Sequence, residues 1–387
     1  MKFSEKLGEG RVIKTNIGET IFKLDSYEKN PIIKPRNLGL TWNENSEMKI
    51  GAVFNGGAEL FEDKIILLPR CHKNYIKREF FDSKIGMKRV SLENYISEIC
   101  PLVSKDGINF TIMKNVVIKG DGTEHKDFIY GIEDIRIIKY KDGYLLIGCG
   151  KIKPSYKGAN ADRIAIYTTK NFVNIKYRGI VKYFDLRDAV PFSEPINGKH
   201  YILLRFHNHI HLDVLEAGSD QMLNPIKYKE LWKKIYEQRS HSLLLEAGSY
   251  PHEREKIGPG TQLIKTKKGW LLIYHAVGEI DINICKAYGL SKKINRAYSI
   301  CAAILDLNDP RKVICRTRKP IYIPSAPYEL NGNRKYPVDV PAVVFPTGII
   351  IRNDKLVIYS GAGDKYIILL SCSLVNLLNY LFKYCKL

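Results

Sequence analysis

The sequence predicts an all-β protein, a five-bladed β-propeller, from one recurring phrase and its spacing. A short run rich in Ile, Leu and Tyr follows a polar turn five times along the 387 residues, at Ile65–Arg70, Tyr144–Gly148, Tyr201–Arg205, Trp270–His275 and Leu356–Ser360. Apolar runs behind turns of the Asp-Gly or Asn-Gly type are typical of β-hairpins. Hairpins at loosely regular intervals indicate radial repetition of a small antiparallel sheet, which leaves few sheet edges exposed.

Each run also has a candidate partner strand directly before its turn. In chain order these partners are Ala58–Phe61, Ile132–Tyr140, Ala189–Ile196, Thr261–Thr266 and Ala342–Ile351. Residues 1–50 are expected to lead into the first hairpin, with an entry strand at 30–33. Because a propeller can use a chain of this length as one unit, we expect residues 1–387 to form a single domain.

Two insertions and a terminal helix interrupt or follow the repeats. The insertions are expected at about 73–104 and 208–251, and the second contains Tyr228–Gln238, whose apolar residues fall at helical spacing. The tail, about 373–385, has the leucine spacing of an amphipathic helix that packs on the outside of the propeller. Loops at a propeller rim can shape a substrate mouth or a contact between copies of the chain, so a homo-oligomer is a possible assembly.

The formal net charge of +20 has two explanations. A basic protein can bind a nucleic acid, an acidic lipid surface or a small anion, but a composition rich in Lys, Asn and Ile accounts for the charge as a whole without any ligand, and we favour that second explanation. The lysines are scattered through loops, without an RNP-like aromatic phrase or a helix-turn-helix pattern, so we expect no nucleic-acid partner. No apolar run is long enough to cross a bilayer, and the segment MKFSEKLGEG lacks a signal-peptide core. We therefore expect a cytoplasmic protein with no membrane partner.

Cysteine and histidine spacing predicts no metal site. The eight cysteines lie far apart without a CxxC pair, so they are expected to be buried small apolar residues rather than zinc ligands or disulfides. His207, His209 and His211 alternate on one face of a strand, but no carboxylate motif of matching spacing accompanies them.

Polar residues recur where the inner strands begin. In a propeller these strands converge on the axis, so such residues face one central funnel. The candidates are Asn55, Glu133, Asp134, Arg136, Arg187, Asp188 and Lys256, with Arg70, Arg205, His275 and Asp364 from the ends of second strands or the turns beyond. Several cations gathered with carboxylates suit an anion together with a polyhydroxylated ligand.

Seven phrases, in order, resemble glycoside hydrolase family 130, which comprises inverting β-mannoside phosphorylases and some related β-mannosidases. They are VFNGGAELF (Val53–Phe61), GIEDIRI (Gly131–Ile137), RDAVPF (Arg187–Phe192), KIGPGTQLI (Lys256–Ile264), GWLLIYH (Gly269–His275), AAILDLNDPRKVI (Ala302–Ile314) and YSGAGD (Tyr359–Asp364). The likeness runs from Asn30-Pro31 to Asp364. The chain departs from the family pattern in having Gly56 and Ile135 in place of prolines, and Arg187 in place of lysine.

The resemblance implies a role for each matching position. Asp134 occupies the place of the general acid, which in the family's phosphorylases protonates the glycosidic oxygen through the sugar's 3-hydroxyl while phosphate attacks C1 from the opposite face. The implied sugar-binding positions are Asn55, Arg70 and Asp364. The implied phosphate-binding positions are Arg187, Arg205, Lys256, His275 and Tyr298.

General chemistry supports the same division of roles. An inverting glycosidase needs a second carboxylate to activate water, whereas phosphate is already a nucleophilic anion and needs only cations to bind and orient it. We therefore predict reversible phosphorolysis of a β-mannoside, a β-1,2- or β-1,4-linked manno-oligosaccharide or mannosyl-glucose, to α-mannose 1-phosphate. Inorganic phosphate is the co-substrate, and no metal or organic cofactor is implied.

Two alternatives stay open at this point. A β-mannosidase would use water and require a carboxylate base, for which Glu194 and Glu253 are the candidates. A carbohydrate-binding propeller without catalytic activity would need neither the acid nor the base.

Overall fold

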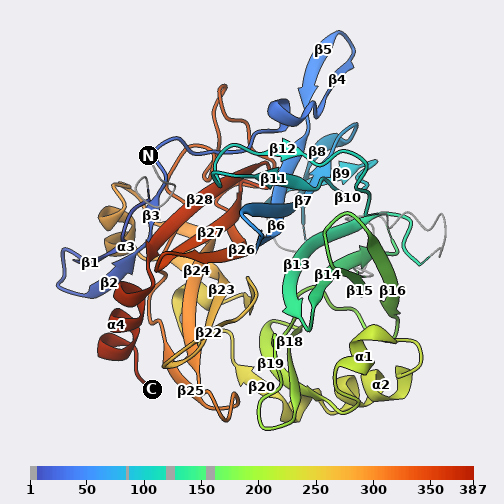
Figure 1. Ribbon diagram of the computed structural model, residues 1–387. Coiled ribbons are helices and arrows are strands. Elements are labelled where there is room, and N and C mark those ends of the chain that lie inside the picture. The colour runs from blue at the N-terminus through green and yellow to red at the C-terminus, as the bar shows by residue number, and fades with distance from the viewer. Residues whose placement is uncertain (1–6, 84–86, 119–126, 154–161) are drawn as a thin grey trace.

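Most of the β-strands in the described part of the chain belong to five antiparallel sheets, which are arranged one after another around a common centre (Figure 1). The computed structural model describes residues 7–83, 87–118, 127–153 and 162–387. All five predicted hairpins are present, one in each sheet. The predicted fold class, a five-bladed β-propeller, is confirmed.

The blades follow the chain in order, each four strands deep. The first blade contains β6 (Ala52–Phe61), β7 (Lys64–His72), β11 (Leu102–Ser104) and β12 (Thr111–Ile112), with β10 (Glu98–Ile99) beside the end of β7. The second contains β13 (Ile132–Tyr140), β14 (Gly143–Lys151), β15 (Asp162–Thr169) and β16 (Ile175–Val181). The third contains β17 (Ala189–Pro191), β18 (His200–Phe206), β19 (His209–Leu215) and β20 (Leu243–Leu245). The fourth has β21 (Lys256–Pro259) and β22 (Ile264–Thr266) as its inner edge, then β23 (Gly269–Ile280), β24 (Ile294–Leu305) and β25 (Val313–Arg316). The fifth contains β26 (Val344–Arg352), β27 (Lys355–Ala362), β28 (Tyr366–Ser373) and β3 (Asp25–Ser26).

The outermost strand of the last blade comes from the beginning of the chain. β3 pairs with β28, so the first and last parts of the chain meet in one sheet and close the ring. The entry strand expected at 30–33 is absent, and only Ile33 forms an isolated bridge. The side chain of Asn30 instead makes both hydrogen bonds to the main chain of Leu369, each 2.9 Å long. A proline at position 31, which has no N–H to donate, follows it.

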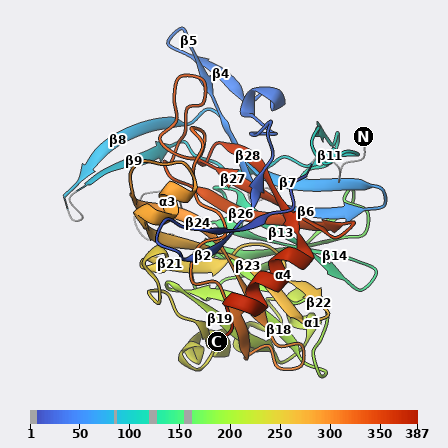
Figure 2. The same ribbon diagram turned by 90° about the vertical axis from the view of Figure 1, so that its left-hand side faces the viewer.

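Several elements lie outside the blades. Three hairpins are formed by β1 (Arg11–Lys14) with β2 (Thr20–Lys23), β4 (Thr41–Glu44) with β5 (Glu47–Ile50), and β8 (Ile76–Asp82) with β9 (Met87–Glu93). The second and third of these hairpins project well beyond the sheets (Figure 2). The helices are α1 (Ser219–Leu223), α2 (Lys229–Glu237), α3 (Ile282–Ala287) and α4 (Leu374–Tyr384), with single 3₁₀ turns η2 (Pro35–Leu38), η3 (Arg239–His241) and η4 (Pro251–Glu253).

Both expected insertions also supply strands to their blades. The interval 73–104 holds the projecting β8–β9 hairpin but also β10 and β11, and its residues 84–86 lie outside the described residues. The interval 208–251 contains β19 and β20, with the two helices between them. A blade needs outer strands to cover its second strand, which is why these intervals return to the sheet.

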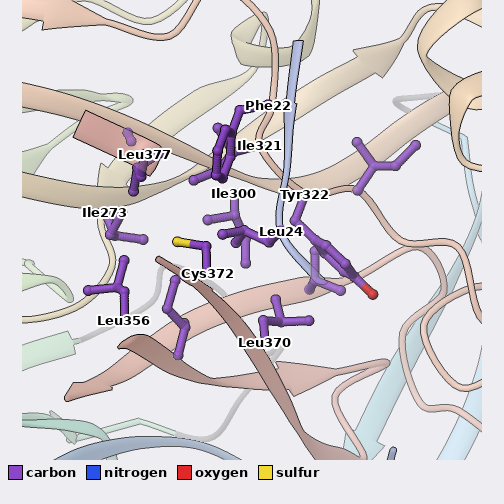
Figure 3. Close-up of a cluster of buried hydrophobic side chains, with 14 of the residues drawn as sticks. Phe22, Leu24, Ile273, Ile300, Ile321, Tyr322, Leu356, Leu370, Cys372 and Leu377 are labelled. Carbon is purple, nitrogen blue, oxygen red and sulfur yellow. The ribbon is translucent and has the colours of Figure 1, made fainter. Parts of the chain in front are cut away.

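The apolar core lies between neighbouring blades. In the cluster between the fourth and fifth blades, Ile273 and Ile300 face Leu356 and Leu370 (Figure 3). The predicted terminal helix α4 begins with Ser373 as its N-cap and adds Leu377 to the same cluster. Packing on both sides of each blade fixes the orientation of the inner strands, and therefore of the side chains at the axis.

Two further features concern the helices and the cysteines. Within the described ranges no helix is both long enough and apolar enough to span a bilayer. All eight cysteines are free thiols, and all but Cys100 are buried.

Candidate active site at one end of the propeller axis

Irregularities near the starts of the inner strands aim polar side chains at the axis. The register of β6 shifts between Phe54 and Gly56, and that of β13 shifts between Glu133 and Arg136. Asn55 and Asp134, which lie at these shifts, have φ angles of 49° and 52°. Asn and Asp tolerate this left-handed region better than other non-glycine residues, and a bulge redirects the side chain that it carries. Asn55 Nδ2 donates a hydrogen bond of 3.1 Å to Asp134 Oδ1.

The two adjacent carboxylates of β13 have different surroundings. Glu133 is bound by Arg70, with Nη1 2.7 Å from Oε2, by Arg187, and by the hydroxyl of Ser97, which donates over 2.6 Å. Burial acts to raise the pKa of Glu133, but Arg70 and Arg187 outweigh it and hold that pKa well below its usual range. The same arginines approach Asp134 only to 3.4 and 3.6 Å. Glu133 is therefore a fixed negative charge that binds the arginines closely, whereas Asp134 contacts them at longer range.

The sugar positions implied by the resemblance lie around Asp134. Asn55 and Arg70 contact it directly. Asp364 has a pKa raised to about 6, mainly by burial and also by the charge of Asp134, against the opposing charge of Arg70. A Cβ at Gly361 would lie 2.1 Å from Asn55 Oδ1, so a glycine is needed there for Asn55 to keep its place.

Asp188 joins two arginines from different blades. Its Oδ1 lies 2.8 Å from Arg136 Nη2, and its Oδ2 lies 2.6 Å from Arg205 Nη1. Arg136 also donates to the carbonyls of Asp134, Pro259 and Gly260 over 2.9 to 3.1 Å. With its donors engaged in this way, Arg136 holds the inner strands together rather than binding a ligand, because a buried guanidinium is stable only when its donors are paired.

The phosphate positions implied by the resemblance form one cluster. Arg205 Nη1 lies 3.5 Å from His275 Nε2, and Lys256 Nζ lies 5.0 Å from the centre of the Tyr298 ring. Burial lowers the pKa of His275 well below its usual value, and Arg205 and Lys256 lower it further against the opposing effect of Asp188, so the imidazole is neutral. Burial acts to raise the pKa of Tyr298, but Lys256 outweighs it and the net shift is downward.

Arg187 and Arg205 connect this cluster to a pocket. Both line a cavity of about 520 Å³ between the second and third blades. Arg187 also contacts Glu133 and Asp134, so it lies between the acidic pair and the cationic cluster. The structure thus brings all nine predicted site residues to one end of the axis.

Two residues that hold Arg187 in place, Lys151 and Asp162, were not predicted from the sequence. Lys151, at the end of β14, pairs with Asp162, at the start of β15, and Arg187 Nε lies 3.6 Å from Asp162 Oδ2. The position of Lys151 at the end of a second strand matches those of Arg70 and Arg205 in their own blades, and this signal could have identified it. Asp162 carries no local signal, because its role depends on the neighbouring strand and blade.

The carboxylates considered as a hydrolytic base are engaged elsewhere. Glu194 follows β17 at the opposite end of the blade from Ala189 and forms an exposed pair with Lys265. Glu253 is fully buried, with Oε2 2.6 Å from Arg316 Nη2 and Oε1 accepting a 2.7 Å hydrogen bond from Tyr274. Neither carboxylate is free to activate a water molecule at the cationic cluster.

Glu253 also belongs to a group of potential metal ligands. Among the described residues, His252, Glu253 and Cys301 place their ligand atoms close together. Because the guanidinium of Arg316 already neutralises Glu253, a cation there would meet a like charge at close range. The donor set does not fit a metal ion.

Fold and site define a five-bladed propeller with an acidic pair and a cluster of basic side chains at one end of its axis. The model of glycoside hydrolase family 130, described as beta-1,4-mannooligosaccharide phosphorylase, matches residues 23–383. The chain belongs to this family, as its sequence phrases indicated.

Individual relatives extend over most of the chain. A 1,2-beta-oligomannan phosphorylase from Thermoanaerobacter sp. (strain X514) is 32% identical over 350 residues, covering 90% of this chain and 96% of the relative. A beta-1,2-mannobiose phosphorylase from Listeria innocua is 29% identical over 382 residues, covering 87% of this chain and 92% of the relative. The solved structure of beta-1,2-mannobiose phosphorylase from Listeria innocua with beta-1,2-mannobiose has the same fold, with a TM-score of 0.65 and 24% identity over 92% of this chain and 99% of that one.

Proposed function

We propose that the protein catalyses reversible phosphorolysis of β-mannosides, with inversion, to α-mannose 1-phosphate. The observation that carries this proposal is the cluster of three cations, Arg187, Arg205 and Lys256, with the neutral His275 beside Asp134. The neighbouring carboxylates Glu133 and Asp188 are paired with arginines, and Asp364 has a proposed sugar-binding role. Family membership and the phosphorylase relatives support it.

In this mechanism Asp134 is the general acid. Asn55, Arg70 and Asp364 hold the mannosyl unit over it, while Arg187, Arg205, Lys256, His275 and Tyr298 hold phosphate on the opposite face of C1. Asp134 supplies a proton to the glycosidic oxygen, through the sugar's 3-hydroxyl as in the family, and a phosphate oxygen forms a bond to C1 as the C1–O bond breaks. The acceptor sugar leaves with the proton, and in the reverse direction Asp134 takes that proton back.

The charges of the cluster act on the transition state as well. The arginines can bind phosphate through two parallel hydrogen bonds each, which orients the attacking oxygen. The positive charge that develops at C1 lies near the fixed negative charge of Glu133 and the carboxylate of Asp134, which stabilises it. A neutral His275 serves here as a hydrogen-bonding partner and not as a charge.

For the substrate we propose a β-1,2-linked manno-oligosaccharide. Support comes from two relatives that match about nine tenths of the chain and are both named for β-1,2 linkages. A β-1,4-linked substrate, named in the description of the family model, is the alternative.

The test is a substrate panel with and without phosphate. β-1,2-mannobiose, β-1,2-mannotriose and β-1,4-mannobiose are incubated with the protein, and α-mannose 1-phosphate and free mannose are quantified, with sulfate replacing phosphate as the control. We expect sugar phosphate from the β-1,2 substrates only when phosphate is present. Free mannose without phosphate would identify a β-mannosidase, and binding without any product would identify a carbohydrate-binding propeller.

Two glycines, Gly258 and Gly361, allow the proposed phosphate-binding and sugar-binding residues to be tested separately. A Cβ at Gly258 would lie 2.5 Å from His275 Cε1 and 2.7 Å from Arg205 Cδ, whereas a Cβ at Gly361 would collide with Asn55. We expect Gly258→Ala to raise the KM for phosphate about tenfold, because it displaces charge-assisted hydrogen bonds, with a smaller effect on the mannoside. Gly361→Ala should do the reverse, so each variant is the control of the other in steady-state kinetics. Equal effects on both substrates would contradict the proposed division.

A further inference from the structure

A polar pocket opens beside the axis, between the second and third blades. It is formed by the start of β15, the loop 183–187, the end of β18 and one residue of α2, and it has a volume of about 520 Å³. These elements lie at the same end of the propeller as the candidate active site, and Arg187 and Arg205 belong to both. A water molecule takes about 30 Å³ of liquid, so the pocket can hold phosphate together with hydration water.

The pocket offers an anion little repulsion. Its two carboxylates are both neutralised, Asp162 by Lys151 and Arg187, and Asp185 by Arg163. Arg205 contacts only one oxygen of Asp188 through Nη1, and its side chain stays partly exposed. A cluster of cations reached through a partly closed polar channel raises the local concentration of anions.

The outer wall of the pocket is rigid and basic. Tyr236 of α2 stacks on Phe184, with ring centres 5.3 Å apart and planes inclined by 9°. The guanidinium of Arg239 covers the Tyr236 ring at 4.1 Å and donates to His207 Nε2 over 3.4 Å. Tyr183, which is 47% exposed, is one of the accessible residues that line the pocket.

We propose that this pocket is the entrance for phosphate, separate from the opening through which the mannoside reaches the axis. The inference rests on the proposed function, since an inverting displacement requires the nucleophile and the leaving sugar to lie on opposite sides of C1. In the proposed function the mannoside is held by Asn55, Arg70 and Asp364, two of which contact Asp134. Arg187 and Arg205 line the pocket, whereas Asn55, Arg70 and Asp364 do not. Phosphate that enters here therefore meets these two arginines without passing the residues that hold the sugar.

A charge series at Tyr183 tests this entrance. Tyr183 has no assigned role in the chemistry, and Glu, Gln and Lys at this position change the charge of the wall by −1, 0 and +1 relative to tyrosine. Relative to Tyr183→Gln, we expect Tyr183→Glu to raise the KM for phosphate about three- to tenfold at low ionic strength and Tyr183→Lys to lower it, with kcat and the KM for the mannoside unchanged. The differences should shrink as sodium chloride is added, because salt screens exposed charges. The KM for α-mannose 1-phosphate in the reverse reaction should follow the same order.

The control is Val173→Glu, which makes the same change of net charge in the turn at the other end of β15 and β16 and should leave the phosphate KM unaltered. Equal phosphate KM values for all three Tyr183 variants would overturn the proposal, and so would a change in the mannoside KM instead, which would make the pocket a sugar site. If the unmodified protein forms no mannose 1-phosphate at all, the proposed function fails. That result differs from equal phosphate KM values across the Tyr183 variants, which would contradict only the proposed entrance.

Discussion

Asp134→Asn is expected to lower kcat for phosphorolysis by about 1,000-fold or more while the propeller stays folded. General acid catalysis contributes factors of this order, and an amide cannot supply the proton that the leaving sugar needs. Asparagine tolerates the φ of 52° at this position as aspartate does and keeps the size of the side chain, so the bulge in β13 should persist. Initial rates, calorimetric binding of mannoside and of phosphate, and a thermal melt separate lost chemistry from lost structure.

The matched control is Asp142→Asn, the same substitution in the turn at the far end of the β13–β14 hairpin, where the carboxylate is exposed. It should leave the rate unchanged. If Asp134→Asn kept more than about a tenth of the activity, the proton would come from another group, since loss of a general acid costs at least about 100-fold.

Arg205→Ala is expected to raise the KM for phosphate about 100-fold or more, with little change in the KM for the mannoside. The guanidinium lies among His275, Asp188 and the pocket that reaches Arg187, and charge-assisted hydrogen bonds of this kind are worth about 1.5–3 kcal/mol each. Asp188 would keep Arg136 as a partner, so the fold should survive the loss.

Thermal melts provide a second measurement of the same effect. The control is Arg311→Ala, because Arg311 lies in the turn at the opposite end of the fourth blade. Phosphate should raise the melting temperature of the unmodified protein and of this control, but not that of Arg205→Ala. Arg205→Lys should recover part of the affinity, because it restores the charge without the planar pair of donors. An unchanged phosphate KM in Arg205→Ala would exclude this residue from the anion site.

Local patterns predicted the blades well. Each hairpin depends on an apolar run and a turn that are neighbours in the chain, and so it can be recognised without knowledge of the rest of the fold. The outer strands were harder to place. β19 and β20 are separated by two helices, and β3 joins a blade whose other strands lie more than 300 residues later, so no local pattern connects them.

Sequence position predicted which polar residues lie together at the axis, but not which partners each of them contacts. Polar residues near the starts of inner strands and at the ends of second strands indicated a shared funnel, and the family phrases named Asp134. Arg136 and Arg205 look alike as charged residues in strands. Arg136 donates to the Asp134 carbonyl of its own strand and to the Pro259 and Gly260 carbonyls of the fourth blade, whereas Arg205 stays partly exposed at a pocket.

By itself the sequence determined that five hairpins form and which polar residues they carry to the axis, because turn chemistry and strand alternation act between residues close in the chain. Only the tertiary structure decided which of the two adjacent carboxylates binds the arginines. That choice depends on bulges that redirect side chains and on partners that are distant in sequence, Arg70 on β7 and Arg187 just before β17. Ion pairs between blades are long-range contacts, and their geometry is set by the packing between sheets and not by the residues beside them in the chain.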